Sequence, residues 1–144
     1  MARAETYRAL GKTDEAAADV KYAAKLRDAI IPPETLNDTA WGLLTGPEGA
    51  RDPKRALELA KKANERKPNT SAILNTLGVA LYRNGQYQEA VTALEKGLAL
   101  GRGKFDAHNL FPLAMCRARL GDRAAAKGCF DQAVKWIEGR SLTP

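Results

Sequence analysis

The amino-acid sequence predicts an all-α protein made of stacked helical hairpins. Its 144 residues are 44% hydrophobic but only 6% aromatic, and 28% are charged, which is typical of an alanine-rich helical protein. A second observation is a spacing of small and apolar residues that recurs roughly every 35 residues, the period of helical repeat arrays. A hairpin of that length cannot bury its own apolar face, so the repeats are expected to stack on one another.

The first repeat is predicted over residues 1–30, and the chain begins partway through its first helix. Its pattern positions are Tyr7, Gly11, Ala16, Val20 and Ala23. The second repeat is predicted over residues 33–70, and the segment "TGPEGARD" inserts a longer turn between its two helices. Its pattern positions are Leu36, Ala40, Leu43, Ala56, Ala60 and Ala63.

The third repeat, over residues 71–104, follows the pattern most closely, and the fourth is predicted over residues 107–140. Their pattern positions are Leu77, Gly78, Gly85, Tyr87, Ala90, Leu94 and Gly97, then Leu113, Ala114, Gly121, Ala126, Phe130 and Ala133. The small residues are expected where helices approach closely. Gly11, Gly85 and Gly121 are expected at helix ends, where glycine readily takes the left-handed conformation.

Proline 112 interrupts the fourth repeat where its first helix should already be running. Proline has no N–H, and its ring clashes with the carbonyl four residues earlier, here that of His108. We expect the helix to start late, with Asn109 as its N-cap and Pro112 in the first turn. The alternative is a helix that begins near Ala107 and kinks.

This spacing resembles that of the tetratricopeptide repeat, a helix-turn-helix unit of about 34 residues. The best match is "LNTLGVALYRNGQYQEAVTALEKGLAL", while Leu36, Leu74 and Leu110 replace the family's tryptophan and its terminal proline survives only as Pro68. The resemblance implies a superhelix of about 3.5 to 4 repeats, forming a single domain over residues 1–144. The segment "LNDTAWGLL" and the helix after it are also similar to arrays in large multidomain bacterial proteins.

The resemblance further implies that the first helix of each hairpin lines a concave groove that binds a peptide. Residues at matching positions would form an apolar centre flanked by amides on one side and arginines on the other. The predicted groove residues are Asn37, Trp41, Asn75, Val79, Tyr82, Arg83, His108, Phe111, Met115 and Arg119. Asparagine can bond to a peptide backbone and arginine to a carboxylate. Alternatively, Trp41, Val79 and Met115 pack between adjacent hairpins.

We therefore expect a scaffold that binds a protein or peptide partner. The alternative is an assembly module whose terminal repeats stack on a partner domain or on another copy, because no polar capping helix follows the last repeat. Catalysis, a metal site and a cofactor are not expected, since His108 is the only histidine. The lysines that would clamp an acidic chaperone tail are also missing from the groove helices.

The charge, the apolar runs and the cysteines of the sequence each add one expectation. The basic segment "RDPKRALELAKKANERK" has no interleaved aromatic residues and is interpreted as a solvated helix face, so nucleic-acid binding is not expected despite a net charge of +6. The apolar runs are too short for a membrane span. Cys116 and Cys129 are expected to be packed, reduced thiols, which favours a cytoplasmic protein.

Overall fold

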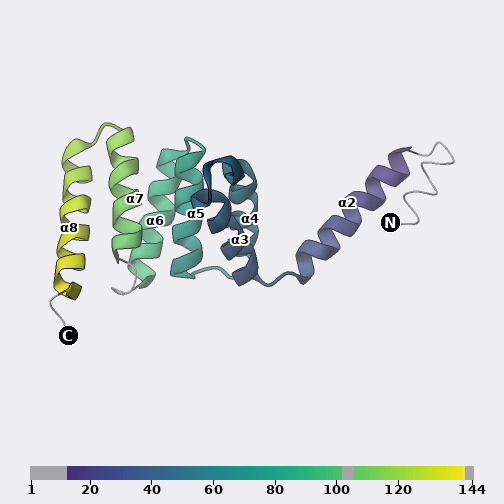
Figure 1. Cartoon of the computed structure of the whole chain (residues 1–144), viewed down its shortest axis with the longest axis horizontal. Coiled ribbons are helices and arrows are strands. Elements are labelled where there is room, and N and C mark those ends of the chain that lie inside the picture. Colours follow the sequence, from purple (N-terminus) through teal and green to yellow (C-terminus); the bar gives the residue numbers. More distant parts are fainter. Residues whose placement is uncertain (1–12, 102–105, 142–144) are drawn as a thin grey trace. The chain divides into compact units, whose positions relative to one another are not determined.

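The computed structural model describes residues 13–101 and 106–141, and the predicted all-α architecture is confirmed (Figure 1). Seven α-helices, α2 to α8, and one short 3-10 helix, η1, make up the regular structure of these residues, and no strand occurs among them. The chain divides into two compact units, residues 1–32 and 33–144. None of the helices within the described ranges is both long enough and apolar enough to cross a membrane.

The first unit contains α2, which runs from Thr13 to Ile30. Asp14 and Glu15 in its first turn and Arg27 in its last turn complement the helix dipole. Tyr22, Leu26 and Ile30 are exposed and follow one another at four-residue intervals, so they share one face of the helix. The predicted first helix of this repeat, with Gly11, lies outside the described residues.

The second unit contains three successive helix pairs. They are α3 (Pro33–Thr45) with α4 (Pro53–Arg66), α5 (Ser71–Arg83) with α6 (Tyr87–Gly101), and α7 (Asp106–Arg119) with α8 (Arg123–Ser141). Each helix packs against the next, and in addition α3 contacts α5 and α5 contacts α7. The first helices of the three pairs therefore lie next to one another, and we call the surface that they share the α3–α5–α7 face. The repeat limits and the single domain stay predictions.

Glycine and aspartate residues shape the turns that precede α4, α6 and α8. Gly85 and Gly121 have φ angles of 78° and 85°, the left-handed conformation expected for them. In the insertion, η1 (Glu48–Ala50) precedes Asp52, whose carboxylate caps α4 by accepting a hydrogen bond of 3.1 Å from the Arg55 backbone N–H. Asp122 caps α8 in the same way, through the Ala125 N–H at 3.0 Å. The two aspartate caps were not predicted.

A small residue is required where α5 crosses α6. A Cβ atom added to Gly78 would lie 2.4 Å from Cγ of Leu94, a fully buried side chain. Ala90, which lies near the start of α6 and precedes Leu94 on that helix, is also fully buried. The close approach expected at the small pattern positions is therefore observed here, and the large leucine fills the space that the glycine leaves.

The predicted late start of the fourth repeat is wrong. Helix α7 begins at Asp106, and Asn109 lies inside it, fully buried, instead of capping it. Because Pro112 has no N–H, the carbonyl of His108 cannot form the usual helical hydrogen bond. The side-chain amide of Asn75 on α5 donates a hydrogen bond to that carbonyl instead.

Packing also holds the turn before Pro112 in the helix. Ala107 and Leu110 are buried and form a cluster with Ala133 of α8. A late start would expose these side chains and lose their contribution from burial, about 25 cal/mol for each Å² of apolar surface. Tertiary contacts therefore outweigh the local preference of proline for the first turn.

Candidate functional site

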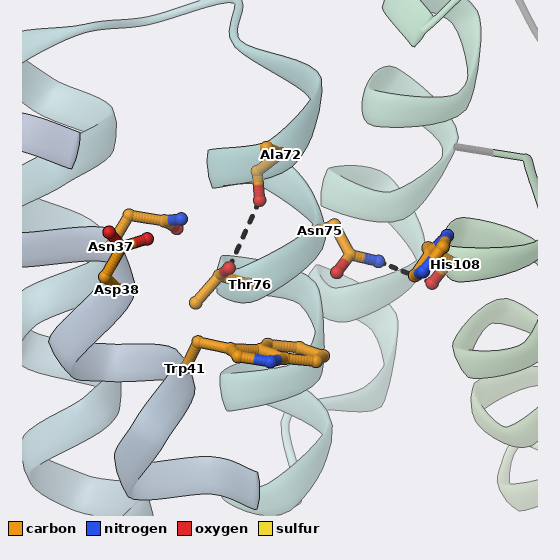
Figure 2. Close-up of a pocket in the computed structure, with 7 residues that line it drawn as sticks. All are labelled: Asn37, Asp38, Trp41, Ala72, Asn75, Thr76 and His108. Carbon is orange, nitrogen blue, oxygen red and sulfur yellow. Dashed lines mark hydrogen bonds between the residues drawn. The ribbon is translucent and has the colours of Figure 1, made fainter. Parts of the chain in front are cut away.

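A pocket of about 240 Å³ opens on the α3–α5–α7 face (Figure 2). Its lining residues come from all three helices: Asn37, Asp38 and Trp41 from α3, Ala72, Asn75 and Thr76 from α5, and His108 from α7. Four of the ten predicted groove residues, Asn37, Trp41, Asn75 and His108, are thus brought together. Helices that are adjacent in space but not in sequence form this site.

The α3 side of the pocket carries groups whose bonding capacity is unused. The ring of Trp41 reaches from α3 toward α5 (Figure 2), and this residue is 38% exposed. Oδ1 of Asn37 is shielded from solvent and accepts no hydrogen bond from the described part of the chain. Asp38 is exposed, and no described lysine or arginine forms an ion pair with it.

The α5 side is bonded within the protein. Asn75 is 7% exposed, and its amide donates to the carbonyl of His108 across the gap between α5 and α7. The hydroxyl of Thr76 donates to the carbonyl of Ala72, one turn earlier, at 3.2 Å. Both bonds are drawn in Figure 2. This side therefore fixes the geometry of the pocket.

A second group of predicted residues meets at the C-terminal ends of α5 and α7. The rings of Tyr82 and Tyr87 lie 5.5 Å apart between centroids. A hydrogen bond with the side chain of Tyr82, and then the electrostatic effect of Tyr82 and Tyr87, raise the pKa of Arg119. Arg83, at the end of α5, is exposed. Arg119 thus lies beside a pair of tyrosines at this end of the face.

The other predicted residues are more dispersed. Val79 is half-buried and Met115 is 44% exposed. Phe111 packs against Phe130 of α8, with ring centroids 5.6 Å apart in an edge-to-face arrangement. Phe111 therefore contributes to the contact between α7 and α8, a role that was not predicted for it.

Sequence reasoning did not place two polar residues of the pocket, Asp38 and Thr76, in the predicted groove. Each directly follows a predicted residue, Asn37 or Asn75, so the repeat spacing that relates the two asparagines also relates these two residues. That shared offset was the available signal. Chemically, the pocket offers one carboxylate, side-chain amides, a hydroxyl, an imidazole and an indole, which suits recognition by hydrogen bonding and stacking.

Comparisons with known proteins agree with this architecture. Residues 54–102 match the family model described as tetratricopeptide repeat. The chain is similar to the solved structure of MamA AMB-1, with 20% identity and a TM-score of 0.65 over 94% of this chain and 76% of that one. It is also similar to the TPR domain of Arabidopsis FLU, with 22% identity and a TM-score of 0.60 over 75% of this chain and 99% of that one. Among curated protein sequences, none matches. The predicted repeat fold is thereby confirmed.

Proposed function

We propose that this chain, whose fold is that of tetratricopeptide repeat arrays, is a protein-interaction module whose α3–α5–α7 face binds a segment of a partner protein. The observation that carries the proposal is the pocket, which pairs a partly exposed tryptophan with polar groups that lack partners in the described structure. Tryptophan, tyrosine and arginine supply most of the binding energy in protein interfaces. Repeat scaffolds of this kind are typically not enzymes, in keeping with the role proposed here.

The face supports binding of an extended segment that contacts both groups of residues. Asn75 and Arg83 lie eight positions apart on α5, which at 1.5 Å per residue corresponds to roughly 12 Å along the helix. An extended chain covers about 3.3–3.6 Å per residue, so roughly four residues would bridge this distance. The pocket would then hold one side chain while Arg83 and Arg119 contact an acidic group further along.

The test begins with capture of the partner from the native organism and continues with calorimetry on the identified partner. Trp41→Ala or Tyr82→Ala should weaken binding by roughly 1–3 kcal/mol, since aromatic anchors dominate such interfaces. Arg83→Glu should mainly lower the association rate. Tyr22→Ala on α2 is the control, because it changes an exposed aromatic residue that does not line the pocket. Unchanged affinity in the first three variants would refute the proposal.

The second candidate is an assembly role through the last helix. Phe130 and Ile137 on α8 are 51% and 43% exposed, and burial of such apolar surface against another copy would be favourable. Phe130→Ser with Ile137→Ser should then abolish a concentration-dependent dimer in analytical ultracentrifugation. A wild-type monomer at every concentration would exclude self-association through this helix.

A further inference from the structure

We infer that the pocket beside Trp41 recognises a positively charged side chain, lysine or arginine, of the partner segment. The inference rests on the proposed function and adds to it the chemistry of the residue that enters the pocket. It follows from three groups that α3 contributes: the Asp38 carboxylate, the Trp41 ring and the Asn37 amide oxygen.

Asp38 gives the pocket a local negative charge. Among the residues that line the pocket, it is the one carboxylate, and no lysine or arginine is present to neutralise it. This local charge is opposite in sign to the net charge of +6 on the whole chain. A carboxylate that has no ion-pair partner in the described structure favours a cationic ligand and repels an anionic one.

Trp41 and Asn37 complement the charges and donors of such a ligand. The face of an indole ring attracts a cation within about 6 Å of its centre. The same chain contains this contact elsewhere, since the guanidinium carbon of Arg140 lies 4.3 Å from the centre of the Trp136 ring. An arginine or lysine side chain also carries several N–H donors, and one of them would satisfy Oδ1 of Asn37.

Other ligands fit the pocket less well. A glutamate or aspartate side chain would lie near the Asp38 carboxylate and be repelled. An apolar side chain would neither pair with the Asp38 carboxylate nor give Oδ1 of Asn37 the hydrogen-bond donor that it lacks in the described structure. A basic side chain is the one class that satisfies Asp38, Asn37 and Trp41 together.

The experiment titrates the full chain with five peptides of the form acetyl-Ala-Ala-X-Ala-Ala-amide, with X as arginine, lysine, citrulline, norleucine or glutamate. Citrulline has the shape of arginine without its charge. Binding is followed through the indole N–H signal of Trp41 in NMR spectra, which Trp136→Phe distinguishes from the other indole signal. The arginine and lysine peptides should shift this signal saturably, and the citrulline and norleucine peptides should bind about tenfold more weakly.

Two variants separate charge from shape. Asp38→Asn should lower the affinity for the arginine peptide about two- to fivefold, as expected of an exposed ion pair. Glu65→Gln is the matched control, because Glu65 is an exposed acidic residue on α4 outside the pocket, and it should leave the affinity unchanged.

Three results would overturn the inference. They are equal affinity for the arginine and citrulline peptides, tighter binding of the glutamate peptide, and no shift of the Trp41 signal with any probe. The proposed function is judged separately, by whether Trp41→Ala weakens the captured partner. A partner that depends on Trp41 but shows no preference for a basic residue would refute only the inference made here.

Discussion

Replacing Asn75 by alanine should lower the free energy of unfolding by about 1–3 kcal/mol. The side chain is 7% exposed, and its amide donates a hydrogen bond to the carbonyl of His108. When that donor is removed, the carbonyl cannot form a helical hydrogen bond in its place, because the residue four positions later is Pro112, which has no N–H. The expected cost combines the lost hydrogen bond with the space that the buried Asn75 side chain leaves.

The origin of this cost can be tested by changing Pro112 as well. Pro112→Ala restores an N–H at the position that normally bonds to the His108 carbonyl, and it should stabilise α7 by up to about 3 kcal/mol. In that background Asn75→Ala should cost at least about 1 kcal/mol less than in the wild-type chain, because the carbonyl now has a helical donor. The difference is the coupling energy of a double-mutant cycle.

Urea unfolding followed by far-ultraviolet circular dichroism gives the four free energies. Asn64→Ala is the control, since Asn64 lies on α4 and forms no hydrogen bond with α7 in the described structure, and it should cost the same with or without Pro112. A second readout is hydrogen exchange, in which the new amide of residue 112 should be protected. An equal cost of Asn75→Ala in both backgrounds would show that the bond to His108 is not what Asn75 contributes.

Two further predictions concern packing. Gly78→Ala should lower the free energy of unfolding by roughly 1–3 kcal/mol, because the new methyl group overlaps the buried Leu94 of α6. Gly42→Ala on α3 should raise the free energy of unfolding by up to about 1 kcal/mol, because its methyl group would have no neighbouring atom within 4 Å and alanine favours the helix. Thermal melts of the two variants check this, and shifts in the same direction would contradict it. Burial raises the pKa of Cys116 to about 11, so a thiol reagent at pH 8 should modify Cys129 quickly and Cys116 only after unfolding. Equal rates in the folded chain would contradict the second prediction.

Helix pairing and turns could be predicted from the sequence because their causes are local. Gly85 and Gly121 take the left-handed conformation that a turn between two helices needs. Most other residue types adopt this conformation only with strain, so the glycines predict the turns. Gly78 was predicted at a close approach because the repeat places a small residue there, and its contact with Leu94 confirms the reason.

The start of α7 could not be predicted in this way. The local rule favoured Asn109 as a cap, with Pro112 in the first turn. The structure follows a contact between residues 33 positions apart, in which Asn75 donates to the His108 carbonyl, whose usual helical donor Pro112 lacks. Sequence reasoning placed Asn75 among the groove residues, but nothing local to Pro112 indicates that a side chain from another repeat bonds to the carbonyl of His108.

Repeat spacing indicated some residues of the candidate pocket and not others. Repeat spacing places residues at matching heights on successive helices, which is why Asn37 and Asn75 line the same pocket. It does not specify the direction in which each side chain points. Phe111 occupies the position that matches these asparagines, yet its ring packs on Phe130 because α8 offers an apolar surface there.

The polar residues of the pocket divide by whether their bonds are already used. On α5, Asn75 and Thr76 donate to backbone carbonyls, so a ligand that competes for these donors must first break a bond that holds the scaffold. On α3, Asn37 and Asp38 have no such bond in the described structure, and a new hydrogen bond there costs no existing one. We therefore expect the free energy that discriminates between ligands to come chiefly from α3. Substitutions on α5 should change stability first, and affect binding through the position of His108.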